Sequence, residues 1–280
     1  MSKAETGRWS RLLVTGAAGE IGSCIRPALR GAAAHLRWHD IRPIADAAPD
    51  EEIMQGDLAE PGVALAATRD VDCLIHLAGI PRETGGTPAE ILRANVIACH
   101  AVFEAARENG VKRFIFASSN HTIGFHPADA LIGTEERPRP SGQYGASKVW
   151  GETLGRLYAD KHGLEVACLR IGAFRERPGN ARELGGWISH GDMASLARAA
   201  VEAPPYHFVV VYGVSANKRA LWGNDAAARA TLGWQPKDDA EAWAAELEGR
   251  TAPAGSIAAR FHGGTVCELG FSGDAEKAGR

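Results

Sequence analysis

The sequence predicts an α/β fold, a doubly wound parallel sheet with a small C-terminal substrate-binding lobe. Short apolar runs alternate with helix-like segments through the first two-thirds of the chain. The runs are apolar throughout, as expected of strands that are buried on both faces of a parallel sheet. A glycine-rich turn, TGAAGEIG, stands between the first apolar run and the first helix-like segment.

The bulk composition is that of an ordinary globular chain. The sequence has 280 residues, of which 45% are hydrophobic and 23% charged, and its formal net charge is -3. This charge gives no reason to expect nucleic acid or a membrane surface as a partner. The start, MSKAETGRWSR, lacks the apolar core of a signal peptide, and no apolar run approaches the ~18 residues of a membrane span. We therefore expect a cytoplasmic protein.

Six strands follow one another in the first part of the chain. They are predicted at Arg11–Thr15, His35–Asp40, Ile53–Gly56, Val71–Ala78, Arg113–Ser118 and Glu165–Ile171. Helices are predicted from the glycine turn to Arg30, from Pro88 to Asn109 and over Tyr144–His162. Crossovers between parallel strands are right-handed, so successive helices cover both faces of the sheet.

The pattern loosens from Gly172. Residues 175–186, RERPGNARELGG, are polar and rich in glycine, which predicts a loop. A helix at Ser189–Glu202, a strand at Phe208–Tyr212 and a helix at Asp225–Leu232 follow. We expect residues 1–171 to bind the cofactor and residues 172–268 to form a small, interleaved substrate-binding portion. We expect residues 269–280 to form a flexible tail.

The cysteines and histidines suggest neither disulfides nor metal. The five cysteines are Cys24, Cys73, Cys99, Cys168 and Cys267, and none forms a CxxC pair. Most lie in apolar runs, which favours buried, reduced thiols. The ten histidines are scattered without ligand spacing, so no metal site is expected.

The glycine turn is typical of dinucleotide binding on a Rossmann-type sheet. Gly16 permits the tight turn, Gly19 lets a diphosphate approach the backbone, and Gly22 lets the helix pack on the strand. The helix that begins at Glu20 and Ile21 then offers free N–H groups and a positive dipole end to phosphates.

An acidic residue at the end of the second strand favours NAD over NADP. Asp40, followed by Ile41, can accept both hydroxyls of the adenosine ribose and repels a 2′-phosphate, although nearby Arg42 could weaken that preference. Two further segments at strand ends are expected along the cofactor. They are Asp57 and Leu58, near the adenine, and Leu77, Ala78 and Gly79, beneath the phosphates and ribose.

The segment YGASK predicts the catalytic groups. Tyr144 and Lys148 are four residues apart and share one helix face. A nearby ammonium lowers the pKa of a phenol, which lets the tyrosine take a hydroxyl proton. Ser119, after the fifth strand, can hold the reacting oxygen beside Tyr144. The alternative is a surface Tyr–Lys helix pair, and the dinucleotide turn upstream argues against it.

Together these motifs resemble the extended short-chain dehydrogenase/reductase family, which includes sugar-nucleotide epimerases and dehydratases. The resemblance implies that Asn95, in RANV, supports the site, and that Lys148 bonds the nicotinamide ribose. Asn95 and Phe174, with Tyr144 and Lys148, complete the expected cofactor-binding residues.

The run FASSNHTIGFHP is more particular and resembles the uronate dehydrogenases. The resemblance continues through LRIG, WISHGDM, VYGVSAN, LGWQPKD and RFHGGT. It implies NAD-dependent oxidation of the anomeric carbon of D-glucuronate or D-galacturonate to an aldarolactone. It also implies that Arg182 clamps the substrate carboxylate, with Arg175 and Arg177 as rivals or the whole loop as a solvated basic segment. Asn120 and His121 follow Ser119 directly and are expected to bond sugar hydroxyls.

Two residues depart from the family pattern on the substrate side. Pro81 and Ala173 stand where the family typically has serines that touch the substrate, and the loop PRETGGTPAE is longer and richer in glycine. Each lost hydrogen bond is worth about 1 kcal/mol. Another sugar or sugar acid is therefore a possible substrate.

Two further alternatives stay open, and one assembly is expected. A nucleotide-sugar epimerase or dehydratase would share the Ser–Tyr–Lys set, although only about 110 residues follow the sixth strand. A redox-sensing protein that holds NAD without turnover would have little need for the Tyr–Lys pair. Family members usually associate through helices flanking the sheet, so we expect a homodimer or larger homo-oligomer.

Overall fold

The computed structural model describes residues 9–278, without side chains for residues 223 and 224. A seven-stranded parallel sheet forms its centre, in the order β10-β7-β5-β4-β1-β2-β3. The strands are β1 (Trp9–Thr15), β2 (Ala33–Asp40), β3 (Glu52–Gln55), β4 (Cys73–His76), β5 (Arg113–Ser119), β7 (Glu165–Ile171) and β10 (Phe208–Gly213). The seven strands expected from the sequence are confirmed, and none of their ends differs by more than two residues.

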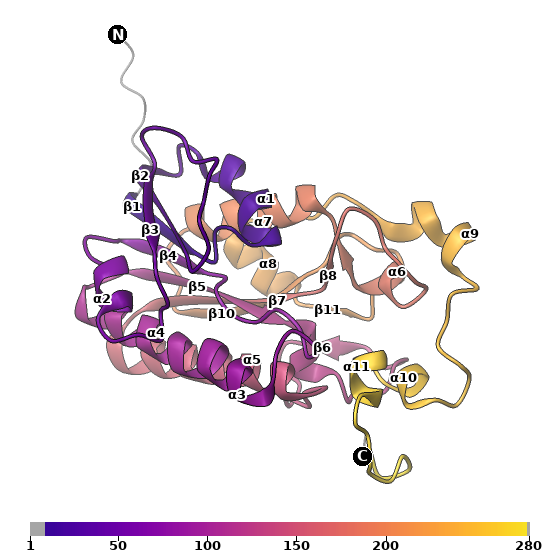
Figure 1. The fold of residues 1–280 in the computed structure, drawn as a ribbon. Helices are drawn as coiled ribbons and strands as arrows, with labels where there is room; N and C mark the ends of the chain where they lie inside the picture. Colours follow the sequence, from indigo (N-terminus) through magenta and orange to yellow (C-terminus); the bar gives the residue numbers. More distant parts are fainter. Residues whose placement is uncertain (1–8, 279–280) are drawn as a thin grey trace.

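Helices cover both faces of the sheet (Figure 1). One layer contains α1 (Glu20–Leu29), α7 (His190–Glu202) and α8 (Ala226–Leu232), and the other contains α2 (Val63–Ala67), α4 (Ala98–Glu108) and α5 (Gln143–His162). Every residue of β5 is buried, whereas the edge strand β3 is largely exposed. Continuous apolar runs therefore mark the central strands, as expected where both faces are covered.

The long helix expected from Pro88 to Asn109 contains a change of winding. It begins as α3 (Pro88–Ile91), widens to a π-helix over Leu92–Ile97 and continues as α4. A π-helical turn is rare and is often found near functional sites. This turn contains Asn95.

Smaller elements gather at the carboxyl edge of the sheet (Figure 1). They are two short two-stranded sheets, β6 (Ile132–Gly133) with β11 (Trp222–Asn224) and β8 (Ala173–Phe174) with β9 (Trp187–Ile188), and the helical turns α6 (Glu183–Gly186), α9 (Ala244–Leu247), α10 (Ile257–Arg260) and α11 (Thr265–Glu268). The prediction of an unbroken loop over residues 175–186 is wrong at its end, because α6 forms there. Short one-turn helices lack the periodicity that reveals a longer helix.

The thiols have the state expected of them. All five cysteines are free; four are buried, and Cys24 is half-buried. Residues 9–278 contain no group of three or more His, Cys, Asp or Glu side chains that could hold a metal ion. Within the same residues, no helix has the length and apolar character that crossing a membrane requires. The first eight residues, which bear on the expected absence of a signal peptide, lie outside the described part.

Candidate active site

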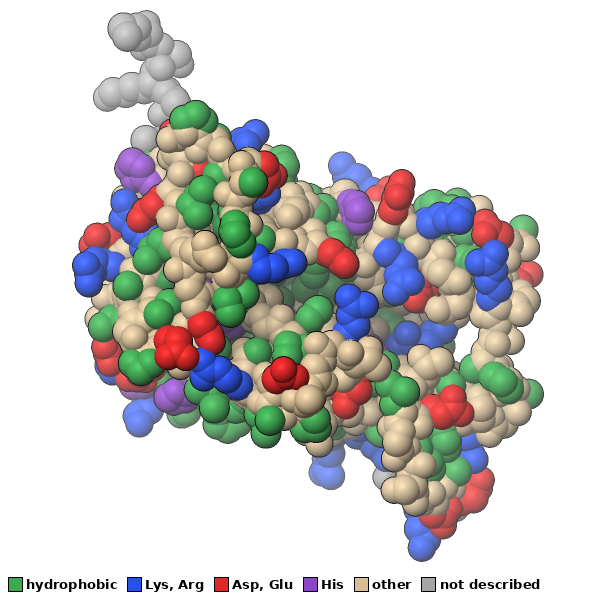
Figure 2. Space-filling view, in the orientation of Figure 1, with side chains coloured by type: hydrophobic (Ala, Val, Ile, Leu, Met, Phe, Trp, Pro, Cys, Tyr) green, Lys and Arg blue, Asp and Glu red, His purple; other side chains and the backbone are tan. Residues whose placement is uncertain are grey.

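A cavity of about 1530 Å³ follows the carboxyl edge of the sheet. Figure 2 shows the hollow on this face, with basic side chains in blue around it. Parallel strands end together here, since Thr15 pairs with His76 and Ser119 pairs with Ile171 in register. In open α/β sheets this edge is where ligands bind. The cavity lining includes all the predicted site residues except Asn95.

The glycine turn fits a dinucleotide closely. Gly16 has a φ of +75°, and a Cβ added to it would lie 2.6 Å from the backbone nitrogen of Ala78. A Cβ on Gly22 would lie 2.4 Å from the carbonyl oxygen of Gly16. Gly19 precedes α1 and provides no side-chain cap. The first N–H groups of α1 thus face the cavity end of the turn without a side-chain partner, which suits a diphosphate.

Asp40 stands beside this turn at the end of β2. Its Oδ2 accepts the N–H of Ala18 at 2.9 Å, and its Oδ1 accepts the N–H of Arg42 at 2.9 Å. A carboxylate oxygen can accept more than one hydrogen bond, so ribose hydroxyls can still bind. The exposed guanidinium of Arg42 bonds the carbonyl oxygen of Ala18 at 2.7 Å and lies 3.5 Å from Asp40 Oδ1. Arg42 therefore crosses the glycine turn next to Asp40.

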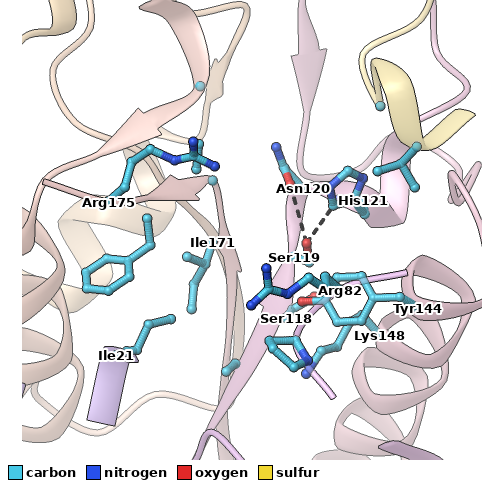
Figure 3. A pocket seen from close by; sticks show the side chains of 18 of the residues that line it. Ile21, Arg82, Ser118, Ser119, Asn120, His121, Tyr144, Lys148, Ile171 and Arg175 are labelled. Carbon is cyan, nitrogen blue, oxygen red and sulfur yellow. Dashed lines mark hydrogen bonds between the residues drawn. The ribbon is translucent and has the colours of Figure 1, made fainter. Parts of the chain in front are cut away.

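The rest of the cofactor part of the cavity is lined by residues at the strand ends that the sequence predicts. Its lining includes Glu20, Ile21, Ile41, Asp57, Leu58, Leu77, Ala78, Gly79 and Phe174. The carboxylate of Asp57 bonds Arg93 at 2.6 Å and also accepts the N–H of Ala59. Figure 3 shows Ile21 and Ile171 on the wall opposite Tyr144.

Asn95 lies behind the cavity wall rather than on it. Its Oδ1 accepts the N–H of Ile80 at 2.7 Å, and its Nδ2 donates to the carbonyl oxygen of Ile80 and to Ser147 Oγ. The side chain is buried. The sequence analysis counts Asn95 among the cofactor-binding residues, and this position does not agree with a direct contact. Asn95 instead connects the loop after β4 to α5 by its hydrogen bonds to Ile80 and Ser147.

Ser119, Tyr144 and Lys148 meet at the centre of the cavity (Figure 3). Ser119 is the last residue of β5, and Tyr144 and Lys148 lie in the first turns of α5. Burial raises the pKa of Tyr144 to about 12, and the hydroxyl of Ser119 lowers it by hydrogen bonding. Burial also lowers the pKa of Lys148 to about 8.

The expectation that the lysine lowers the tyrosine pKa is not met in this structure. The Lys148 ammonium lies 5.6 Å from the centre of the Tyr144 ring and 5.0 Å from that of Phe116. At that separation burial dominates the pKa of both groups. As the pH rises, Lys148 therefore loses its proton before Tyr144 does, whereas an active phenolate–ammonium pair needs the tyrosine to lose its proton first.

A buried ionic network supports this centre from beneath. Ser118 Oγ donates to the carboxylate of Glu152, which receives two hydrogen bonds of 2.9 Å from Arg170. Arg170 also bonds the hydroxyl of Tyr212 at 3.3 Å. Such a bidentate pair fixes geometry, because a guanidinium and a carboxylate match in one plane. The network ties β5, α5, β7 and β10 together below Ser119.

Asn120 and His121 follow Ser119 on a short 3-10 turn. Ser119 Oγ accepts the N–H of His121 at 3.2 Å and donates to Asn120 Oδ1 at 3.4 Å (Figure 3). His121 Nδ1 is 2.9 Å from Ser141 Oγ. Burial, with the nearby Arg182 charge, lowers the pKa of His121 to about 3. The imidazole is therefore neutral near neutral pH, and its Nε2 is left for a ligand.

Arg182 is the cation best placed for an anionic substrate. It lies directly before α6, donates its Nε–H to the carbonyl oxygen of His262, and has its guanidinium carbon 5.7 Å from the Trp222 ring. No carboxylate of residues 9–278 lies within 4.0 Å of its nitrogens. Arg175 and Arg177 instead pair with Glu183 at 3.4 Å and Glu246 at 3.7 Å, and both are more than half exposed.

The wall behind Arg182 comes from the last part of the chain. Phe261 forms a β-bridge with Pro127, and the N–H of Gly263 bonds the carbonyl oxygen of Gly124 at 2.8 Å. His262 Nδ1 accepts from Trp222 Nε1 at 2.9 Å, so its Nε2 donates to the carbonyl oxygen of Ala130 at 2.8 Å. These hydrogen bonds fix one neutral tautomer of His262.

The roles of Phe261, His262 and Arg82 could not be predicted from local pattern. Phe261 and His262 lie in the segment RFHGGT. The sequence signal for them is the resemblance of this segment to the uronate dehydrogenases. Arg82 lies beside Pro81 in the loop after β4 and points into the cavity (Figure 3). No ion pair joins it to a carboxylate within the described residues. Pro81 and Ala173 also line the cavity, as expected.

Comparisons with known proteins agree with this geometry. Residues 12–175 match the model of the NAD dependent epimerase/dehydratase family. The chain is 43% identical to the uronate dehydrogenase of Agrobacterium fabrum, over 92% of this chain and 97% of the relative. It is 42% identical to that of Pseudomonas putida, over 89% of this chain and 92% of the relative.

A solved structure gives the same result. The crystal structure of a uronate dehydrogenase mutant from Agrobacterium tumefaciens, complexed with NAD, superposes with a TM-score of 0.85 at 42% identity. The match covers 92% of this chain and 97% of that one. The chain belongs to the NAD dependent epimerase/dehydratase family, and within it to the group of the uronate dehydrogenases.

Proposed function

We propose that the protein is an NAD-dependent dehydrogenase that oxidises the anomeric carbon of a hexuronate, D-glucuronate or D-galacturonate, to an aldarolactone. The observation that supports it most is Arg182, a guanidinium with no carboxylate partner among the described residues. It lies in the same cavity as Ser119, His121 and Tyr144. A carboxylate-bearing sugar supplies the missing partner, since carboxylates match the fork of an arginine.

The residues present fit NAD. The glycine turn accepts the diphosphate, Asp40 the adenosine ribose, and Lys148 the nicotinamide ribose. When bound, NAD supplies the hydride acceptor and a positively charged ring beside the tyrosine. The related structure in complex with NAD supports this assignment.

The protein's own groups handle the proton and the orientation of the sugar. Ser119 holds the anomeric oxygen, and Tyr144 as phenolate takes the anomeric hydroxyl proton while the C1 hydride leaves for the cofactor. C1 thereby gains a double bond to oxygen and the ring oxygen stays attached, which gives the lactone. Asn120 and neutral His121 bond the sugar hydroxyls, and Arg182 holds the carboxylate.

The test is a panel of sugars with purified protein. D-glucuronate, D-galacturonate, D-glucose, D-galactose and a UDP-sugar are each mixed with NAD, and then with NADP, while NADH or NADPH absorbance is followed. Rapid NADH formation with the uronates alone is expected. Turnover of neutral aldoses instead would mean that Pro81 and Ala173 have moved the specificity. No turnover of any free sugar by protein that binds NAD would overturn the assignment.

We also infer a homo-oligomer that uses the α4–α5 layer. Four large apolar side chains on or near these helices are 43–55% exposed: Leu92, Ile97, Trp150 and Leu157. Exposed apolar side chains that belong to one helical layer favour burial against a partner. Light scattering should give at least the dimer mass, and Leu157→Asp should reduce it. A single species of monomer mass in the unmodified protein would exclude this assembly.

The division into residues 1–171, 172–268 and 269–280 and the cytoplasmic location stay predictions.

A further inference from the structure

The N-terminus of the helix that contains the tyrosine is capped from a distant loop. α5 begins at Gln143 after Gly142, which has no side chain to cap it. The carboxylate of Glu83 accepts the N–H of Gln143 at 2.9 Å and the N–H of Tyr144 at 2.8 Å. The first N–H groups of a helix have no partner within it, and a negative charge there is favourable. Glu83 therefore acts as the cap that the local sequence lacks.

The Glu83 carboxylate packs directly against Gly142 at the start of α5. A Cβ on Gly142 would lie 2.5 Å from Glu83 Cδ and Oε2. The φ of Gly142 is -176°, an extended conformation that any residue can adopt. A side chain at this position would therefore displace the carboxylate, and glycine leaves room for it.

The loop that contains Glu83 is held along its length. Asn95 binds both backbone groups of Ile80 at one end, and a capping box between Thr87 and Glu90 starts α3 at the other. Glu83 fixes the middle to α5. The side chains of Pro81 and Arg82, which line the cavity, lie between the first two attachments.

The same helix end is also held from the substrate side. The N–H of Ser141 bonds the carbonyl oxygen of His121 at 3.0 Å. Ser147 Oγ donates to the carbonyl oxygen of Tyr144 at 2.7 Å and accepts from Asn95. Tyr144 therefore has its N–H fixed by Glu83 and its carbonyl oxygen by Ser147. The loops after β4 and β5 therefore both attach to the start of α5, through Glu83 and His121.

We propose that Glu83 is a positioning residue for the reaction, which sets the place of the Tyr144 phenol relative to Ser119 and fixes the loop of Pro81 and Arg82 to α5. This proposal rests on the proposed function for its kinetic consequence. A displacement of a reacting group by about 1 Å can cost on the order of 10²-fold in rate, so a cap on this helix acts on kcat. Substrate binding depends mainly on Arg182 and His121, so KM should change little.

The experiment compares Glu83→Ala and Glu83→Gln with a matched control, Asp192→Asn. Asp192 also accepts two consecutive backbone N–H groups, those of Lys237 at 2.9 Å and Asp238 at 3.0 Å, and does not line the cavity. Glu83→Ala should lower kcat by about 10- to 100-fold with less than about a threefold change in KM. Glu83→Gln should recover part of that loss, since its amide oxygen can accept one N–H. Asp192→Asn should lower Tm and leave kcat unchanged.

Hydrogen exchange gives a readout that needs no substrate. The amides of Gln143 and Tyr144 should exchange about tenfold faster in Glu83→Ala than in the wild type, and at the wild-type rate in Asp192→Asn. Wild-type kcat in Glu83→Ala, with only a lower Tm, would reduce Glu83 to a structural cap and overturn the proposal. If the wild type oxidises no uronate, the proposed function fails by itself. Unchanged exchange at Gln143 and Tyr144 would overturn the role of Glu83 in that case as well.

Discussion

Arg182 donates its Nε–H to the carbonyl oxygen of His262, eighty residues later in the chain. This contact joins the loop after β7 to the C-terminal segment. It orients a guanidinium whose two terminal nitrogens have no hydrogen-bond partner among the described residues. Because burial lowers the pKa of Arg182, the protein holds this charge at a cost that an anionic ligand would offset.

Replacing Arg182 by Met should lower kcat/KM for D-glucuronate by about 100-fold, because a charge-assisted bidentate contact is lost. The loss should fall mostly on KM, and the Kd of NADH should be unchanged. Arg177→Met is the matched control from the same loop, since Arg177 is exposed and paired with Glu246. Equal losses in the two variants would remove Arg182 from the substrate site.

Trp222 supports Arg182 through His262. Trp222→Phe removes the hydrogen bond to His262 Nδ1 but keeps an aromatic ring near the guanidinium. We expect KM for the uronate to rise by about threefold to tenfold, with kcat nearly unchanged, as for loss of a bond of ~1 kcal/mol. Trp234→Phe is the control, because Trp234 is equally buried and bonds Ser195 away from the cavity. A rise in KM of the same size in that control would contradict the prediction.

The pKa order of the catalytic pair predicts an unusual pH profile. The active form needs Tyr144 deprotonated and Lys148 protonated, whereas their pKa values are about 12 and about 8. The fraction of this form rises with pH up to about 8 and is then constant until about 12. Measured kcat/KM, which reports the free enzyme, should therefore rise about tenfold per pH unit below about 8 and level off above it.

Removing the lysine should abolish that break. In Lys148→Met the active fraction depends on Tyr144 alone, so kcat/KM should be lower but should keep rising between pH 8 and 10. His121, with a pKa of about 3, contributes no break near pH 6.5 in either protein. A wild-type profile with its break near pH 6.5 would show that another group controls the reaction.

Asp40 and Arg42 should set the cofactor preference in opposite directions. Asp40→Asn removes the charge that repels a 2′-phosphate. The ratio of kcat/KM with NAD to kcat/KM with NADP should therefore fall by about tenfold. Arg42→Met removes the cation beside Asp40, which would favour a 2′-phosphate, and should therefore raise this ratio. The four ratios of wild type, singles and double variant are measured with one uronate at saturation. An unchanged ratio in Asp40→Asn would place the ribose elsewhere.

Arg82 should act on anionic substrates in particular. Its side chain points into the cavity without an ion-pair partner among the described residues (Figure 3). Arg82→Met should lower kcat/KM for uronates by about tenfold and leave the KM of NAD unchanged. A rise in the KM of NAD in place of this change would assign Arg82 to the cofactor phosphates.

The cofactor half was largely predictable because its residues are neighbours in sequence or stand at strand ends. The spacing of Gly16, Gly19 and Gly22 fixes a turn, and the register of the sheet brings Asp40 to the same edge. Tyr144 and Lys148 share a helix face at a fixed separation. In each case local geometry is enough to place the side chain.

The rest depends on contacts between distant segments. Nothing near Glu83 shows that it caps a helix sixty residues later, and nothing near His262 shows that its carbonyl oxygen holds Arg182. The order of the pKa values of Tyr144 and Lys148 depends on burial, which the spacing of the two residues does not give. Asn95 could be assigned to the site by resemblance, but its place behind the wall required the structure.

The pairing of residues 124–128 with residues 260–263 also has a consequence for the order in which the protein matures. During synthesis, the glycine turn, Asp40 and Tyr144 have all been made by the time residue 171 is added. The backbone that holds Arg182, at His262, is added some ninety residues later. A nascent chain can thus assemble its nucleotide groove well before it has a place for a sugar acid, and a ribosome that stops early releases a protein without a finished acid-binding wall.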